Sequence, residues 1–152
     1  MKDLRKTWRK FPQYSAKTTI LLDDSVGKAL LQPDNHICLV EYTAKERARD
    51  VKLFRDNVAA IASTTEEPGP EPPYDDFMLA TVGILEEIRE KDDVSAWLWG
   101  GGLRIVDQDQ TATLQPGAIW FEDPGVLEYW VKRGKATLDS LQIPIDAGVT
   151  SR

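Results

Sequence analysis

The stretch TTILLDDSVGKALLQPDNHICLV, residues 18–40, decides the fold class of this chain. Its two continuous apolar runs, 20–22 and 37–40, are typical of strands that are buried on both faces, as in a parallel sheet. Between them a short helix can form over residues 26–31, capped by Ser25, and a Pro-Asp-Asn turn sends the chain back. The order strand, helix, strand is a βαβ crossover, so the sequence predicts an α/β fold with parallel strands.

Further helices are predicted where apolar residues recur at helical spacing. They cover residues 4–11 before Pro12, 44–61, 77–88 after the capping Asp75 or Asp76, and 124–141 after the capping Asp123. In the 44–61 helix the apolar stripe lies among charges, which predicts that this helix covers a face of the sheet. The last helix is interpreted as a docking helix or a partner surface. Weaker patterns predict short strands at 94–99 and 103–106.

The composition is that of a globular protein of one-domain size. The chain has 152 residues, 41% of them hydrophobic and 29% charged, and a formal net charge of −6. This acidic balance argues against a general nucleic-acid binder and against a protein that binds anionic membranes. No apolar segment reaches the roughly 20 residues that span a bilayer. The single cysteine, Cys38, permits no internal disulfide, so we expect a reducing compartment inside the cell, nuclear or cytoplasmic.

Two adjacent carboxylates, Asp23 and Asp24, follow the first predicted strand. Ligands of open parallel sheets gather beyond the carboxyl ends of the strands, so the location suits a functional site. Adjacent carboxylates repel each other unless a cation or a lysine relieves the repulsion, and Mg²⁺ prefers oxygen ligands of this kind. The other interpretation is that Asp-Asp-Ser only caps the next helix, where acids are favoured in any case.

Four segments in register resemble the second half of an FCP1-homology domain. They are MKDLRKTW at 1–8, ILLDDSVGKALLQPDNHI at 20–37, DDFMLATVGILEEI at 75–88 and KDDV at 91–94. These domains, also called NLI-interacting-factor-like, belong to the haloacid-dehalogenase superfamily of aspartate-nucleophile phosphatases. The resemblance implies a partial Rossmann-like parallel sheet with flanking helices. It assigns residues 1–99 to this half-domain and leaves 100–152 as an irregular segment plus a C-terminal helical extension. Within the half-domain, the four prolines of residues 63–76 exclude a helix or a central strand and predict a Pro-rich loop or linker.

The resemblance also implies site roles for three residues. Lys2 looks like the family's lysine that holds the phosphate and offsets the charge of the nucleophile. Asp24 looks like the family's magnesium ligand, and Asp23 like its neighbour that orients Lys2 or the metal's water. The sequence departs from the family pattern at Val26, where proline is usual, and in a longer insert between Lys2 and the strand.

The family's nucleophile motif, Asp-x-Asp-x-Thr/Val, is expected before Lys2, and no residue there supplies it. Residues 107–111, Asp-Gln-Asp-Gln-Thr, match the motif out of chain order, and we interpret Asp107 and Asp109 as solvated loop acids. Without the nucleophile, Mg²⁺ loses a ligand and the phosphate has no acceptor. Whether the chain is an enzyme therefore stays open at this point.

Two hypotheses about function follow from the sequence. The first is that the chain is a portion of a Mg²⁺-dependent FCP1-like serine/threonine phosphatase, inactive alone. The second is that it is a non-catalytic protein-interaction module that kept the half-fold and uses the Pro-rich loop and the last helix to bind a protein partner. Its partner is accordingly a phosphoprotein substrate or another protein, and Mg²⁺ is expected only if a nucleophile segment completes the site. The strand that bears Asp23 is expected to have an unpaired edge. This predicts marginal stability, or burial of the edge by a partner, by self-association with a second copy, or by residues 103–106.

Overall fold

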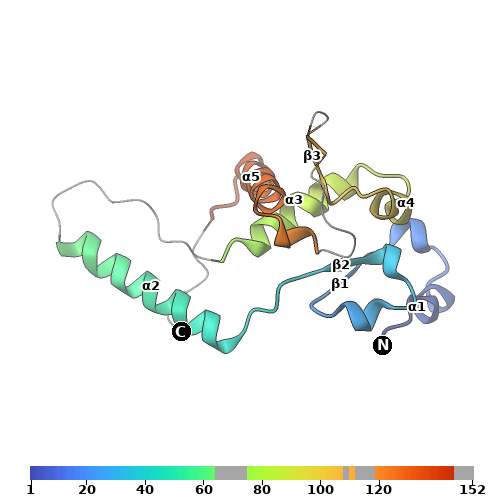
Figure 1. The fold of residues 1–152 in the computed structure, drawn as a ribbon, viewed down its shortest axis with the longest axis horizontal. Helices are drawn as coiled ribbons and strands as arrows, with labels where there is room; N and C mark the ends of the chain where they lie inside the picture. The colour runs from blue at the N-terminus through green and yellow to red at the C-terminus, as the bar shows by residue number, and fades with distance from the viewer. Residues whose placement is uncertain (64–74, 108–109, 112–118, 146–152) are drawn as a thin grey trace.

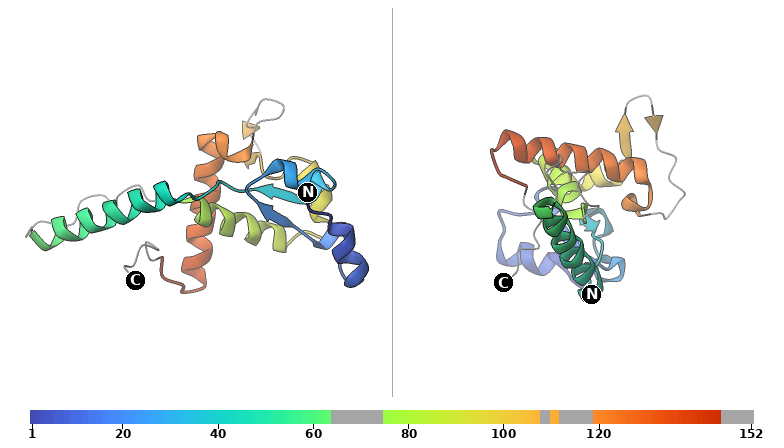
Figure 2. Two further views of the ribbon diagram at one scale, coloured as in Figure 1. Left: turned by 90° about the horizontal axis from the view of Figure 1, so that it is seen from below. Right: turned by 90° about the vertical axis from the view of Figure 1, so that its left-hand side faces the viewer.

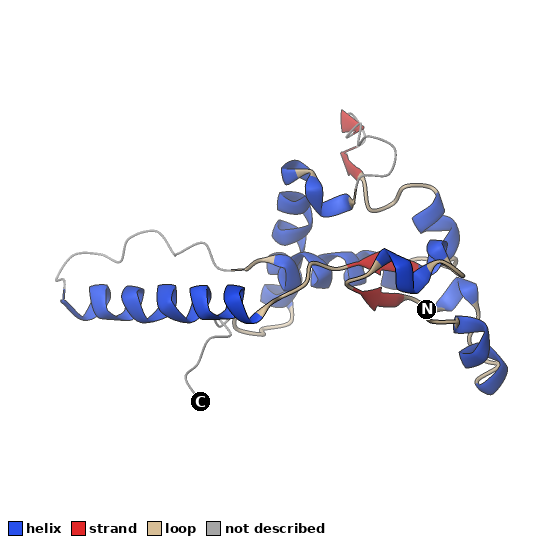
Figure 3. Cartoon of the chain, turned by 60° about the horizontal axis from the view of Figure 1, so that its bottom comes forward, coloured by secondary structure: helices blue, strands red, loops and turns tan. Residues whose placement is uncertain are grey.

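The computed structural model describes residues 1–63, 75–107, 110–111 and 119–145 (Figure 1). Helices make up most of this part of the chain, and the strands are short (Figure 3). The helices and strands are α1 (Leu4–Lys10), β1 (Leu21–Asp23), β2 (His36–Cys38), α2 (Ala44–Ser63), α3 (Phe77–Arg89), α4 (Val94–Trp99), β3 (Ile105–Asp107), β4 (Gln110–Thr111) and α5 (Pro124–Ser140). Short 3₁₀ turns are η1 (Ala16–Thr18), η2 (Val26–Ala29), η3 (Pro33–Asn35) and η4 (Trp120–Glu122).

The strands β1 and β2 pair in parallel, which confirms the predicted orientation and the α/β class. Leu21 lies opposite His36, and Asp23 lies opposite Cys38. The connection between the strands differs from the prediction, because it consists of the 3₁₀ turns η2 and η3 rather than a helix over residues 26–31. Two features explain this. The side chain of Ser25 makes no capping hydrogen bond, and Gly27 is a poor helix former within so short a segment.

The core lies between the sheet and the packed helices α3 and α5, which cross closely (Figures 1 and 2). It draws residues from both sides of residue 99, where the sequence suggests a boundary. The contact of α3 with α5 is close enough that Gly83 and Gly134 meet backbone to backbone. Buried core residues are Ile37, Ala80, Ile84, Ile88, Val94, Trp120, Val126, Trp130 and Val131.

Two predicted helices have surroundings that differ from the prediction. The predicted helix at 44–61 forms as α2, but the expectation that it covers a sheet face is wrong, since α2 extends away from the body (Figure 2). The last helix forms as α5, and Asp123 caps it by accepting hydrogen bonds from the amides of Gly125 and Val126, at 2.8 and 3.3 Å. Its apolar face is buried against α3 and is therefore part of the core instead of a free docking surface.

The two weaker strand predictions have different outcomes. Residues 94–99 form the helix α4 and no strand, because Asp93 caps them by accepting the amide hydrogen of Ala96 at 3.0 Å. The strand expected at 103–106 forms slightly later, as β3, and pairs antiparallel with β4 in a separate small sheet. Most of the Pro-rich loop, residues 64–74, lies outside the described residues. Within the described part, no helix is long and apolar enough to cross a membrane.

Candidate functional site

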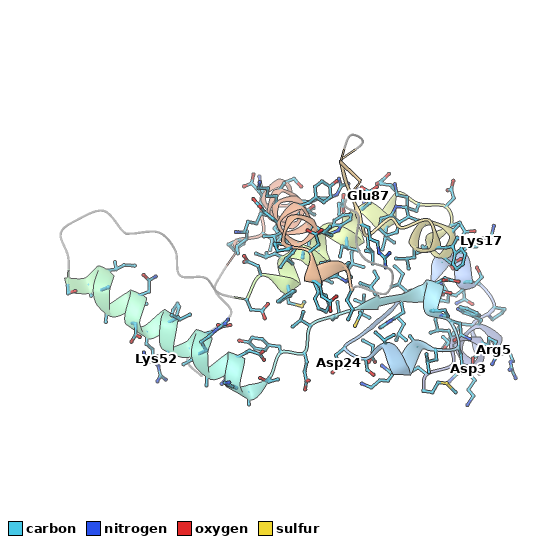
Figure 4. All side chains as sticks on the ribbon, in the orientation of Figure 1. Asp3, Arg5, Lys17, Asp24, Lys52 and Glu87 are labelled. Carbon is cyan, nitrogen blue, oxygen red and sulfur yellow. The ribbon has the colours of Figure 1, made fainter. Side chains whose placement is uncertain are left out.

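The acid pair lies at the carboxyl end of β1, as the sequence predicts. Asp23 is the last residue of the strand and is only 7% exposed, whereas Asp24 follows it on the surface. Figure 4 shows Asp24 at this end of the strand, on the side of the molecule where the N-terminal segment also lies. The two neighbouring carboxylates therefore have different surroundings, and their chemistry must be considered separately.

Backbone and side-chain hydrogen bonds bring Lys2 to this strand end. The amide of Lys2 donates to the carbonyl of Lys28 at 2.7 Å, and the amide of Leu4 donates to Oε1 of Gln32 at 3.0 Å. These bonds hold the N-terminal segment beside η2. The ammonium group of Lys2 then reaches Oδ2 of Asp23 and forms both a hydrogen bond and an ion pair with it.

A second lysine, Lys28, lies between the two carboxylates. Its Nζ is 3.1 Å from Oδ1 of Asp23 and 2.9 Å from Oδ1 of Asp24. The amide of Ser25 also donates to Oδ1 of Asp23 at 3.0 Å. The sequence patterns did not identify Lys28 as a site residue. The signal that could have identified Lys28 is its position four residues after Asp24. This spacing brings opposite charges together when the chain forms a helical turn.

The two lysines make Asp23 strongly acidic. The hydrogen bond from Lys2 is the main cause that holds the pKa of Asp23 well below its usual range; burial acts in the opposite direction, and Lys28 and Ser25 lower the pKa further. The pKa of Lys28 is raised because Asp24 and then Asp23 accept hydrogen bonds from it. Two positive and two negative groups thus face one another, so the acid pair is neutralised without a metal ion.

The backbone around the acid pair is held by neighbouring side chains. Asn35 is buried, and its amide donates to the carbonyls of Ala16 and Thr19 at 2.6 and 2.8 Å, which fixes the turn before β2. Nε2 of His36 lies 3.0 Å from the carbonyl oxygen of Asp23, so the Nε2–H form of the ring donates to it. These contacts hold the backbone around the end of β1. The carboxylate groups themselves face Lys2 and Lys28.

Lowering the pH should lower the free energy of unfolding, because Asp23 loses its charge and with it its ion pairs. The pKa of Asp23 in the folded chain is lower than the value of about 3.9 in an unfolded chain. The contribution of Asp23 to the free energy of unfolding is therefore complete above about pH 3.9, and it is lost as the pH falls below that value toward the pKa of the folded chain. The urea midpoint of Asp23→Asn should therefore be lower than that of the wild type at pH 7, and the difference should shrink at pH 3. Asp56→Asn, at an exposed carboxylate, is the control. A difference that is the same at both pH values would contradict this role of Asp23.

The described residues supply one ligand position for a metal rather than a complete site. Lys2 and Lys28 occupy both oxygens of Asp23, whereas Lys28 contacts only one oxygen of Asp24. Nowhere in the described part of the chain do three or more His, Cys, Asp or Glu residues form a group that could hold a metal. Mg²⁺ takes six oxygen ligands and keeps several waters, so the second oxygen of Asp24 fits one position and the others would need another source.

The Asp-x-Asp match at residues 107–111 is only partly described. Asp107 ends β3, and Thr111 ends β4, whereas residues 108 and 109 lie outside the described residues. The sheet of β3 and β4 is separate from the sheet that bears Asp23. Asp107 is therefore a strand residue, paired with Gln110, and the interpretation of it as a loop acid is wrong. The same interpretation of Asp109 stays a prediction, because residue 109 lies outside the described residues.

Comparisons of the chain with protein-family models, with curated proteins and with solved structures give no match.

Proposed function

We propose that this chain carries the lysine and aspartate portion of an FCP1-like, Mg²⁺-dependent serine/threonine phosphatase of the haloacid-dehalogenase type, and that it is inactive alone. The observation that supports the proposal is the ion pair of Lys2 with Asp23 at the carboxyl end of a parallel strand. These residues are 21 positions apart, and the resemblance assigns both of them to one site. The expected substrate is a phosphoprotein of the nucleus or cytoplasm.

Each residue has a distinct part in this proposal. The ammonium group of Lys2 would attract a phosphate and offset the charge of the attacking carboxylate, since electrostatic stabilisation and positioning are the main contributions to phosphoryl transfer. Asp23 holds that ammonium group in place. Asp24 would provide one oxygen to Mg²⁺, which when bound supplies charge stabilisation for the phosphoryl group. The nucleophile and the remaining metal ligands would come from a segment that completes the sheet beside β1.

The role of Asp24 can be tested by magnesium titration of the isotopically labelled chain. In ¹H–¹⁵N spectra we expect Mg²⁺ to shift the amides near Asp24 and Ser25, with a dissociation constant of about 1 mM or weaker because one carboxylate is a poor site. Asp24→Asn should abolish these shifts. Asp56→Asn is a matched control, because Asp56 is also exposed and also pairs with a lysine four residues away, Lys52, at 3.0 Å.

Two outcomes would overturn the proposal. The first is a set of magnesium shifts that persists unchanged in Asp24→Asn or that appears equally around Asp56. The second is hydrolysis of a phosphate ester by this chain alone that is lost in Asp109→Asn, because that result would place the nucleophile out of chain order. With wild-type chain alone and added Mg²⁺, we expect no hydrolysis above background.

An alternative function, a non-catalytic protein-interaction module, is favoured by the exposed apolar side chains near β1. Leu22 is 37% exposed, Val26 52% and Leu30 66%, and in the described residues β1 pairs on one side only. An unpaired strand edge with apolar neighbours is a surface on which another chain can add a strand. Absence of the magnesium shifts at Asp24, together with protection of the β1 amides by a bound protein, would favour this alternative.

A further inference from the structure

Helix α1 presents a row of basic side chains to solvent. Trp8 is partly buried, and its Nε1 donates a hydrogen bond to Oγ1 of Thr19 at 2.9 Å, which holds one side of α1 against the chain. Lys6, Arg9 and Lys10 are three and four residues apart on the other side of the helix, and all three are exposed. These three residues are called the basic face of α1. Figures 1 and 2 show α1 at the end of the molecule opposite to α2.

The charges of this basic face are not balanced by the chain itself. Among the residues that the structure describes, none of the three forms an ion pair, and α1 contains no acidic residue. Lysines on other helical turns have an acid four residues away that pairs with them, namely Lys28 with Asp24, Lys52 with Asp56, Lys91 with Glu87 and Lys132 with Glu128. The acidic chain therefore neutralises these lysines but leaves α1 positive.

Stabilisation of the helix does not explain the basic face. Bases in the last turn favour the helix dipole, which accounts for Arg9 and Lys10. Lys6 lies in the first turn, where the dipole disfavours a positive charge. It also repels both Arg9 and Lys10, since like charges three or four residues apart destabilise a helix. A negatively charged partner would remove this repulsion.

The distribution of charge along the chain indicates the size of that partner. Residues 1–17 contain six basic residues and one acid, whereas residues 18–152 contain 13 basic residues and 24 acids. A nucleic-acid duplex or an anionic membrane extends far beyond α1 and would be repelled by the rest of the chain. The seven residues of α1 are about 10 Å long, the length of roughly three residues of extended peptide. A few carboxylates on one peptide segment can therefore contact α1 alone.

Two exposed aromatic side chains follow the basic face. Phe11 is 43% exposed and Tyr14 50%, and the amide of Tyr14 donates to the carbonyl of Phe11 at 3.0 Å, which closes a turn. Nζ of Lys10 lies 5.6 Å from the centroid of the Phe11 ring. Cations and aromatic surface thus lie side by side, which suits a peptide that has an apolar side chain next to its carboxylates.

We propose that the basic face of α1 binds a short acidic segment of a partner protein, with an apolar side chain of that segment against Phe11. The guanidinium of Arg9 can hold a carboxylate through two hydrogen bonds. Arg5 already does so with Asp3, whose two oxygens lie 3.0 and 3.3 Å from Nε and Nη2 of Arg5. This surface is separate from the candidate functional site, and it does not depend on the phosphatase proposal.

The test is fluorescence anisotropy of the full chain with a labelled ten-residue peptide that contains five glutamates and one phenylalanine. We expect the triple variant Lys6→Gln/Arg9→Gln/Lys10→Gln to raise the dissociation constant about tenfold, because three charge-assisted contacts are lost. The same peptide with glutamine at each glutamate should not bind. A matched control variant loses the same number of exposed positive charges elsewhere, by glutamine at Lys45, Lys52 and Lys132. The control should bind the acidic peptide like the wild type.

Two further measurements separate binding from folding. The melting temperature of the triple variant should not fall, since the substitutions remove repulsion within α1. The single variant Arg9→Gln makes a smaller change to the same surface and should weaken binding about threefold.

Three results would contradict the proposal. The first is a wild-type chain that does not bind the acidic peptide even at low salt, where exposed charges are least screened. The second is equal weakening in the triple variant and in the control, because the net charge of the chain and not α1 would then decide binding. The third is binding of a single-stranded oligonucleotide or of phosphatidylserine vesicles that is tighter than that of the peptide and is lost in the triple variant.

Discussion

Replacing Trp120 with alanine is expected to lower the free energy of unfolding by about 3–5 kcal/mol, the usual cost of removing a buried tryptophan. Trp120 is 4% exposed, and its ring packs edge to face against the ring of Phe121, with the ring centroids 5.3 Å apart. Its Nε1 donates a hydrogen bond to the carbonyl of Cys38, 82 residues earlier, at 2.9 Å. The substitution therefore removes both packing and the link between η4 and the strand β2.

The chain offers a matched control in Trp99, which is 80% exposed. Trp99→Ala should change the free energy of unfolding by less than about 0.5 kcal/mol, as is usual for surface positions. Trp120→Phe retains most of the ring and removes the hydrogen bond, so we expect an intermediate loss that includes about 1 kcal/mol for that bond. Urea denaturation of the three variants measures these differences. If Trp120→Ala were no more destabilising than Trp99→Ala, residues 100–152 would not share one cooperative core with β2.

The second large effect is expected for Gly134→Ala, which should destabilise the fold by about 2–3 kcal/mol. A Cβ atom at residue 134 would overlap the carbonyl oxygen of Leu79 and lie 2.7 Å from its carbonyl carbon. The neighbouring atoms are backbone atoms of α3, so they cannot rotate away as a side chain could. The helices α3 and α5 must then separate, and the loss of their packing exceeds the roughly 1 kcal/mol that alanine gains over glycine in helix propensity.

Gly27→Ala is the control for this prediction. A Cβ atom at residue 27 would meet only Oγ of Ser25, at 3.7 Å, which is an ordinary contact. Thermal or urea unfolding should show that Gly27→Ala is close to wild type in stability. A Gly134→Ala variant that is as stable as the wild type or more stable would show that α3 and α5 are not in close contact.

The sequence by itself determined the local structure near its strongest signals. The apolar runs at 20–22 and 37–40 predicted a parallel pair, and β1 and β2 form it. The capping residue Asp123, followed by proline, predicted where α5 begins, because a cap acts through hydrogen bonds to the next few amides. The resemblance predicted that Lys2 lies beside the acid pair, and in the structure Lys2 forms an ion pair with Asp23. The roles of these residues in phosphoryl transfer stay predictions.

Only the tertiary structure decided features that depend on which surfaces meet. Periodicity identified α2 as a helix but could not show that its apolar residues lie outside the core of the described residues. An amphipathic pattern is the same whichever surface covers it. The six residues of α4 were too few for periodicity to separate a helix from a strand. The contact of Lys28 with both carboxylates arises because η2 turns tightly, and the need for glycine at 83 and 134 arises because two helices meet there, although propensity alone favours alanine at both positions.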